Sequence, residues 1–209
     1  MVASPDASGN PPRPTSSRNR TRNFADASAD APAFHFVTDW KIAARIEEAY
    51  AALINMPDYH RWWPAAFLKS TPIGGTPGAV GAQTDIVLKG MLPFTIPFRA
   101  TLEQAEAPAR FSFTTEGVVI GRGLYTLQQD HGSLTITFDW AANSSDPKLN
   151  RVARSPLGQI FQANHNWVQR QGGRSLILEL ARRAGRIDVP PPPGPAALWL
   201  ARLLRQPLE

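Results

Sequence analysis

The sequence of 209 residues contains no cysteine, which excludes disulfide bonds, thiolate nucleophiles and metal sites with cysteine ligands. No stretch approaches the roughly 18 consecutive apolar residues that a membrane-spanning helix needs. The first thirty residues lack the apolar core of a secretory signal, so we expect a cytoplasmic location. The four histidines, at positions 35, 60, 131 and 165, are too far apart to indicate a metal site, and none is predicted.

The signatures of several large enzyme classes are also missing. The sequence has no HExxH zinc motif, no G-x-S-x-G nucleophile motif and no G-x-x-x-x-G-K-[ST] phosphate loop. The glycine-rich stretch 75–81 matches neither phosphate-binding fingerprint, so it is predicted to be a loop. We therefore predict no metal and no nucleotide cofactor.

The chain is basic, with a formal net charge of +5 and a pI of about 10.1. Much of the excess is arginine near the C-terminus, namely Arg151, Arg154, Arg170, Arg174, Arg182, Arg183 and Arg186. A basic stripe on a helix can contact phosphates or an anionic membrane surface. Because no nucleic-acid-binding motif accompanies the charge, we favour a solvated outer helix face and predict no nucleic-acid partner.

Both ends of the chain differ in composition from its middle. Residues 1–33 are rich in Ser, Ala, Pro, Asn, Asp and Arg and have almost no large apolar side chains, so we predict a disordered arm. Residues 187–209 contain a proline run and then an apolar pattern around Trp199, which predicts a linker and a short amphipathic helix. The domain between them is expected to span residues 34–186.

The middle of the chain begins with one strand and two short helices. The alternation in 34–40 predicts a strand, and apolar residues at helical spacing over 46–54 predict a helix that Pro57 ends. The stretch 58–64 can form at most a short second helix, and a further strand starts at Phe67. Strand patterns then follow one another, with short connections, at 81–89, 94–105, 109–118, 121–129 and 133–142.

The last of these strands shows most clearly how the sheet is built. Leu134, Ile136, Phe138 and Trp140 alternate with polar residues, so one face of the sheet is apolar and the other is polar. Short connections imply antiparallel neighbours. A helix predicted over about 156–184 is the only element long enough to cover the apolar face. We therefore predict an α+β helix-grip fold, a curved antiparallel sheet wrapped around a long C-terminal helix.

Several local strings resemble the polyketide cyclase/dehydrase branch of the Bet v 1-like superfamily, also called START or SRPBCC proteins. The strings are Trp40 with the helix 45–55, the aromatic stretch 59–64, residues 88–94, residues 130–135, and residues 161–165 with Gly172. The resemblance covers about residues 34–184 and implies an apolar cavity between sheet and helix. Some such proteins catalyse ring closure or dehydration of polyketides, and others carry lipids, quinones or hormones.

His165 is the residue most able to do chemistry in such a cavity. Phe161, His165, Val168 and Gly172 fall on one helix face, which points inward if the helix-grip prediction holds. An imidazole there can act as a general acid or base. The alternative is a structural histidine that hydrogen-bonds a strand carbonyl and fixes the helix. The sequence leaves both interpretations open.

Other candidate ligand contacts come from the sheet and the second helix. One of Trp62 and Trp63 is expected to line the pocket, and we choose Trp63. Further candidates for ligand binding are Phe98, Phe113, Tyr125, Trp140, His165, Val168 and Gly172. The alternative for Phe98, Phe113 and Trp140 is that they are packing residues of the core, as such aromatic residues more often are. Tyr125 and Arg99 can present polar groups to an oxygenated ligand, although a one-residue slip in register would turn either one outward. Gly172 and Gly173 either admit a close neighbour or mark a bend in the helix.

These observations favour a binding protein for a hydrophobic or aromatic small molecule. The first alternative is a cyclase or dehydratase with His165 as acid or base and Tyr125 or Arg99 steadying an oxyanion. The second is lipid or quinone handling at a membrane surface, with peripheral contact through the basic C-terminal region. The sequence indicates neither the ligand nor the oligomeric state.

Overall fold

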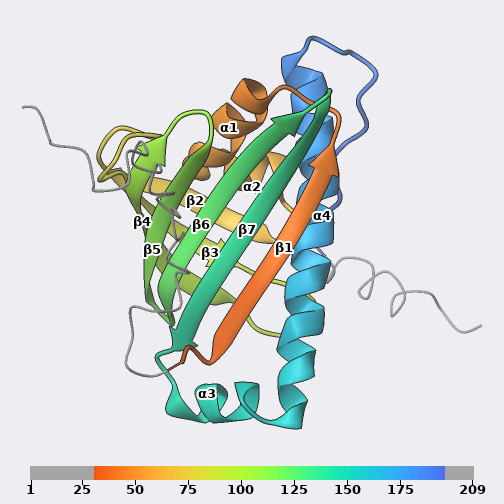
Figure 1. The fold of residues 1–209 in the computed structure, drawn as a ribbon. Helices are drawn as coiled ribbons and strands as arrows, with labels where there is room; N and C mark the ends of the chain where they lie inside the picture. Colours follow the sequence, from red (N-terminus) through yellow and green to blue (C-terminus); the bar gives the residue numbers. More distant parts are fainter. Residues whose placement is uncertain (1–30, 196–209) are drawn as a thin grey trace, which may run out of the picture.

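The computed structural model describes residues 31–195, and its centre is one antiparallel sheet (Figure 1). The seven strands have the order β1-β7-β6-β5-β4-β3-β2, so β1 and β2 are the two edges. Their bounds are β1 Phe34–Ile42, β2 Phe67–Gly74, β3 Gln83–Leu88, β4 Ile96–Glu106, β5 Arg110–Gly117, β6 Val119–Asp130 and β7 Ser133–Ser144. The predicted antiparallel sheet is confirmed.

Helices join the two edges of the sheet and then cover it. Helix α1 (Ile46–Ile54), a 3₁₀ turn (Met56–Asp58) and α2 (Tyr59–Trp62) connect β1 to β2. After β7 come α3 (Pro147–Ala153), a second 3₁₀ turn (Pro156–Gly158) and the long α4 (Gln159–Arg183). Figure 1 shows the strands curving across the molecule while α4 runs along its whole height beside β1. The predicted helix-grip fold is therefore confirmed.

Two side chains start the C-terminal helical region as expected. Asp146 accepts a hydrogen bond from the Lys148 backbone N–H at 2.8 Å, and Ser155 accepts one from Leu157 N–H at 3.2 Å. A proline follows each cap, at a position where its missing N–H costs nothing. The helix predicted over 156–184 therefore begins as a 3₁₀ turn and continues as α4.

The core lies between the concave face of the sheet and the helices. On β7, Leu134, Ile136 and Phe138 are buried, as the alternation predicts. Across the sheet, Phe36 on β1 lies opposite Trp140 on β7, and Tyr125 on β6 lies opposite Phe138. These pairs form a continuous aromatic surface beneath α4, because residues facing one another across strands share a face.

The two glycines of α4 do different things. An added Cβ at Gly172 would lie 2.2 Å from Cζ2 of Trp63, whereas at Gly173 it would meet Trp40 at 3.5 Å. The first distance is far below van der Waals contact and the second is ordinary. Of the two interpretations of these glycines, close approach therefore describes Gly172, since the indole of Trp63 lies directly against the helix backbone.

The regular elements run from Phe34 at the start of β1 to Arg183 at the end of α4, and the predicted domain bounds of 34 and 186 stay a prediction. The predicted disordered arm (1–33) and the predicted C-terminal helix around Trp199 fall almost wholly outside the described residues, and both stay predictions. Among the described helices, none is long and apolar enough to cross a membrane.

Candidate ligand-binding cavity

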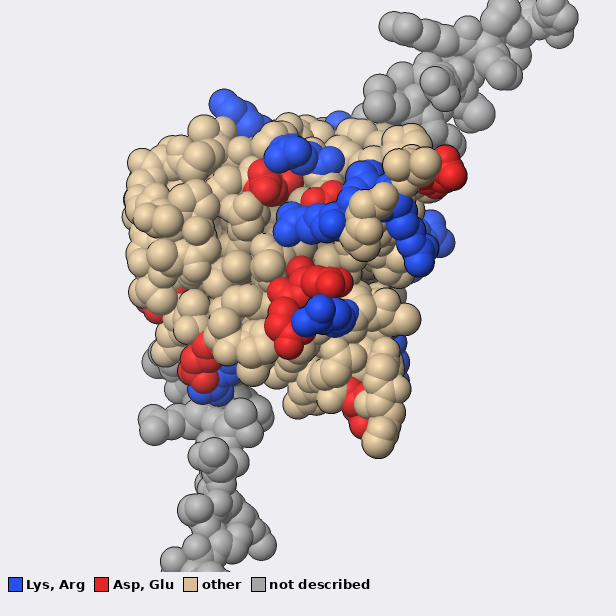
Figure 2. Space-filling model, turned by 90° about the horizontal axis from the view of Figure 1, so that it is seen from above, with Lys and Arg blue, Asp and Glu red and all other residues tan. Residues whose placement is uncertain are grey.

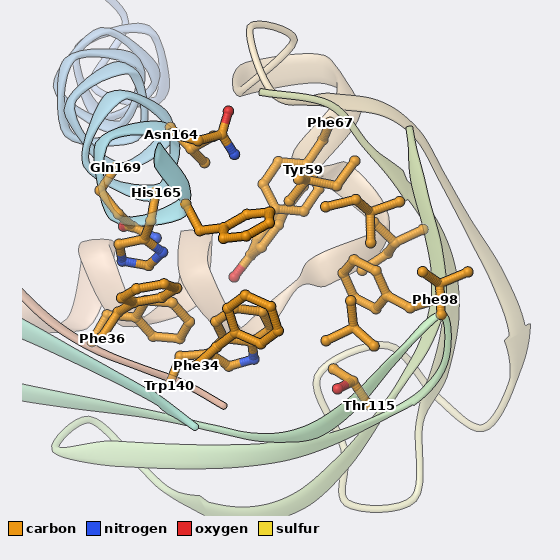
Figure 3. A pocket seen from close by; sticks show the side chains of 18 of the residues that line it. Phe34, Phe36, Tyr59, Phe67, Phe98, Thr115, Trp140, Asn164, His165 and Gln169 are labelled. Carbon is orange, nitrogen blue, oxygen red and sulfur yellow. The ribbon is translucent and has the colours of Figure 1, made fainter. Parts of the chain in front are cut away.

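A cavity with a volume of about 190 Å³ lies between the sheet and α4 (Figure 3). Its wall is formed by all seven strands, the 3₁₀ turn at Met56, α2 and the residue after it, the connection between β3 and β4, α3, and the first three turns of α4. An apolar cavity of about 150 Å³ admits a benzene-sized molecule. The space is therefore large enough for a small ring compound.

The wall is aromatic and carries no formal charge. None of the described residues that line the cavity is Asp, Glu, Lys or Arg. The few polar groups are amides, hydroxyls, indole N–H groups and one imidazole, on Tyr59, Trp63, Thr115, Tyr125, Trp140, Ser144, Asn164, His165 and Gln169. An ion placed here would lose its hydration without meeting an opposite charge, which costs several kcal/mol. The cavity therefore favours uncharged molecules.

Most of the candidate residues from the sequence lie in this wall. They are Trp63, Phe98, Phe113, Tyr125, Trp140, His165 and Val168. The period-two pattern of strands and the period of the helix were enough to assign these side chains to one interior. Their contact with a ligand stays a prediction. Trp62, by contrast, is buried beside Trp63 as a core residue and does not line the cavity.

Gly172 and Arg99 do not line the cavity. Trp63 lies between Gly172 and the open space, so this glycine serves the packing of the indole. Arg99 follows the inward Phe98 on β4 and therefore points outward, where it pairs with Asp85 at 2.9 Å and Glu116 at 3.7 Å. The hydrogen bond from Arg99 lowers the pKa of Asp85. The suggestion that Arg99 steadies an oxyanion in the cavity is wrong.

His165 is a neutral, flat part of the wall. Its Nε2 lies 3.1 Å from the hydroxyl of Thr38 on β1, and its ring stacks on Phe36 with centroids 4.3 Å apart. Burial lowers the pKa of His165 to about 4, so the imidazole is uncharged at neutral pH. The structural interpretation expected a strand carbonyl as the partner of His165, whereas the structure places the side-chain hydroxyl of Thr38 there.

Two phenols form a second polar group deep in the cavity. Tyr59 donates its hydroxyl hydrogen to the Leu53 carbonyl, and a hydrogen bond joins the phenols of Tyr59 and Tyr125. Burial raises the pKa of both groups. They stay protonated at neutral pH, which keeps this part of the wall uncharged as well.

Sequence reasoning missed Asn164, Gln169 and Thr115. The Oε1 atom of Gln169 and the Oγ1 atom of Thr115 are buried without a hydrogen-bond partner among the described residues. Figure 3 shows Gln169 next to His165 on α4 and Thr115 on the opposite side. A signal for Asn164 and Gln169 was present, because each lies on the inward stripe of the helix or next to it.

One end of the cavity is open and is surrounded by apolar side chains. The connection between β3 and β4, the turn after β5, α3 and the start of α4 all contribute lining residues there, namely Leu92, Phe94, Val118, Leu149 and Phe161. On the outer side of this rim, Met91 is 46% exposed, Phe94 42%, Leu157 60% and Ile160 51%. This end is therefore an apolar surface that continues into the cavity.

The opposite end of the molecule has mixed charges. Figure 2, which views the end with α1 and the last turns of α4, shows basic and acidic groups side by side. Arg182 and Arg183 both bind Glu179, at 3.3 and 2.8 Å, and Arg61 lies 3.4 Å from Asp58. The arginines at the end of α4 are thus partly neutralised and form no continuous cationic patch here.

Together, the fold and the cavity define a helix-grip protein of the Bet v 1-like type. Residues 33–170 match the family described as "Polyketide cyclase / dehydrase and lipid transport", and the chain belongs to that family. The resemblance seen in the sequence is therefore confirmed. Comparison with the curated proteins gave no match.

Solved structures share the fold at low sequence identity. TTHA0849 from Thermus thermophilus is 11% identical, with a TM-score of 0.57 over 69% of this chain and 97% of its own. Ginseng major latex-like protein 151 from Panax ginseng is 9% identical, with a TM-score of 0.53 over 68% and 95%. Ara h 8.0201 is 8% identical, with a TM-score of 0.51 over 71% and 98%. At these identities the likeness concerns the fold alone.

Proposed function

We propose that this protein reversibly binds an uncharged, largely aromatic small molecule in the cavity between the sheet and α4. The observation that carries the proposal is the cavity wall, which is lined by aromatic rings and, among the described residues, by no charged side chain. Each square ångström of apolar ligand surface removed from water contributes about 25 cal/mol. Flat rings such as Phe36, Trp140 and His165 add stacking contacts.

The neutral state of His165 favours binding over catalysis. A general acid or base works best when its pKa lies near the operating pH. The pKa of His165 is about 4, and Arg99, the expected oxyanion partner, points away from the cavity. A cyclase or dehydratase would need another group to move the proton. The amides and phenols in the wall orient a ligand without exchanging protons at neutral pH.

The binding proposal is tested by blocking the cavity. Phenylnaphthylamine, an uncharged dye that fluoresces in apolar surroundings, would be titrated into the protein. Val168 lines the cavity and is 5% exposed, so Val168→Phe and Val168→Trp should fill it and lower the dye affinity at least about tenfold. The control is Ile177→Trp, because Ile177 lies on the same helix but is 52% exposed.

The outcomes separate clearly. Weaker binding by the two Val168 variants, with native circular dichroism and normal binding by Ile177→Trp, supports the proposal. Dye that binds the wild type and both folded Val168 variants equally would overturn it, because the dye would then be bound elsewhere. Failure of the wild type to bind any uncharged aromatic dye would overturn it as well.

A second candidate function is exchange of the ligand with an anionic lipid bilayer, and the open end of the cavity favours it. Met91, Phe94, Leu157 and Ile160 expose apolar surface around the opening. Lys148 and Arg151 are exposed on the neighbouring α3, and no described acidic residue forms an ion pair with either one. Apolar tips beside unpaired cations suit insertion at the surface of an anionic membrane.

Vesicle sedimentation tests this second function. The protein should pellet with phosphatidylcholine vesicles that contain phosphatidylglycerol, and high salt should weaken the binding. The double variant Met91→Ser/Phe94→Ser should lose this behaviour, while Ile177→Ser, which removes an exposed apolar residue away from the opening, should keep it. Equal pelleting of both variants would refute docking through this end, and loss only after removal of residues 1–30 or 196–209 would assign it to a terminal segment.

A further inference from the structure

Asn164 on α4 holds the connection between β3 and β4 against the mouth of the cavity. Its Oδ1 accepts hydrogen bonds from the backbone N–H groups of Met91 at 2.7 Å and Leu92 at 3.3 Å. The same connection contributes Leu92 and Phe94 to the cavity wall. One side chain thus joins the helix to the loop that borders the opening.

Gly90 makes this close approach of loop and helix feasible. A Cβ added at position 90 would lie 2.2 Å from Oδ1 of Asn164 and 2.7 Å from its Nδ2. These distances are incompatible with any side chain larger than hydrogen unless the amide moves. The two hydrogen bonds therefore fix the amide of Asn164, and the lack of a side chain at Gly90 leaves the space that the amide occupies.

The fixed orientation has a chemical consequence. Both hydrogen bonds use the oxygen, so the amide nitrogen must point elsewhere, and no described residue accepts from it. Asn164 lines the cavity, and Figure 3 shows its amide at the cavity edge with the nitrogen toward the rings of the wall. An N–H group that is held in place and has no partner is a preorganised donor.

We propose that the Nδ2 amide of Asn164 donates a hydrogen bond to a carbonyl oxygen of the bound ligand. The inference rests on the proposed function and narrows the ligand to an uncharged ketone, ester, amide or quinone-like compound on an aromatic body. A carboxylate is disfavoured because no described cation lines the cavity to neutralise it. The neutral imidazole of His165, next along the helix, supplies no such charge.

The test uses two ligands of similar shape, acetylnaphthalene and isopropylnaphthalene, which differ in one carbonyl group. Each would displace phenylnaphthylamine from the wild-type protein. A net hydrogen bond between neutral groups corresponds to a preference of about fivefold for the acetyl compound. The infrared C=O stretch of bound acetylnaphthalene should also fall relative to its value in hydrocarbon solvent.

The key variant is Asn164→Asp, measured at alkaline pH so that the new carboxyl group is ionised; it keeps an oxygen for Met91 and Leu92 and removes the donor. The preference for acetylnaphthalene should disappear and the infrared shift should vanish. Asn166→Asp is the matched control, since Asn166 accepts a hydrogen bond from Gln162 on the same helix and does not line the cavity. This variant should keep both the preference and the shift.

The results distinguish a failure of the proposed role of Asn164 from a failure of the proposed ligand binding in the cavity. Binding of both ligands with equal affinity by the wild type, or a preference that survives in a folded Asn164→Asp variant, overturns the role of Asn164 and leaves the cavity proposal standing. If neither ligand displaces the dye from the wild type, the proposed function fails and this inference fails with it. If Asn164→Asp does not fold, Asn164→Ser, which retains only a small hydroxyl, should show the same loss of preference.

Discussion

The contrast between Gly172 and Gly173 provides a direct test of how α4 packs. In a helix interior, replacing glycine by alanine gains about 1 kcal/mol of unfolding free energy from backbone entropy. At Gly173 the new methyl group would meet the ring of Trp40 at 3.5 Å, an ordinary contact. Gly173→Ala should therefore raise the unfolding free energy by about 0.5–1 kcal/mol.

At Gly172 the same methyl group would meet Cζ2 of Trp63 at 2.2 Å. Trp63 is 1% exposed and has little room to move, because the rings of Trp40, Trp62 and Phe67 lie 5.6, 5.5 and 4.8 Å from it. Overpacking of this kind costs about 1–3 kcal/mol, which outweighs the gain in helix propensity. The net effect is a loss of about 0–2 kcal/mol, so Gly172→Ala should lower the unfolding free energy by about 1 kcal/mol.

Urea unfolding followed by far-ultraviolet circular dichroism would measure both variants. The expected separation between them is about 2 kcal/mol, with Gly173→Ala above the wild type and Gly172→Ala below it. Because Trp63 lines the cavity, Gly172→Ala should also weaken binding of phenylnaphthylamine. Equal unfolding free energies for the two variants would refute the close packing of Trp63 on α4.

Three further predictions concern His165, Asn164 and Arg99. His165 has its pKa lowered from 6.5 to about 4, so as pH falls from 6.5 to 4 the unfolded chain takes up a proton that the folded protein does not. The unfolding free energy should fall by roughly 3 kcal/mol over that range, and His165→Phe should flatten the curve measured by urea titration at each pH. Asn164→Ala should expose the Met91 and Leu92 amides to faster hydrogen exchange and cost about 1–2 kcal/mol; unchanged exchange would contradict the hydrogen bonds. Arg99→Ala removes exposed ion pairs with Asp85 and Glu116, so it should change the unfolding free energy little and leave dye binding intact, whereas loss of dye binding would contradict the outward position of Arg99.

The neutral cavity should respond differently to anionic and to uncharged dyes. Anionic dyes would have to leave their charge at the opening or bury it against uncharged groups. A weak response to such dyes would therefore agree with the structure, and uncharged probes are the informative ones. The same reasoning predicts that ligand affinity is insensitive to salt, whereas vesicle binding through Lys148 and Arg151 is sensitive to it.

Much of the architecture followed from local patterns. The alternation in β7 and its neighbours, the prolines after Asp146 and Ser155, and the length of the predicted C-terminal helix were sufficient to predict the sheet, the caps and the covering helix. These signals act over a few residues, because side chains alternate along strands and recur every three to four residues on helices. For the same reason, most of the candidate residues named from the sequence lie in the cavity wall.

Other features depended on which segments meet in space. The sequence allowed Arg99 to face either way. Only the pairing of β4 with its two neighbours, which places Arg99 opposite Asp85 on β3 and Glu116 on β5, shows that it faces outward. It left the glycines of α4 open until Trp63 was found against Gly172.

The hydrogen bond between Met91 and Asn164, next to the close contact at Gly90, joins residues that are 73 positions apart in the sequence. No local pattern predicts it. Local periodicity thus determined the elements and their inner faces, whereas tertiary packing decided which polar groups stay unpaired in the cavity. The physical reason is that hydrogen-bond partners and steric contacts come from distant elements, whose relative placement no short stretch of sequence records.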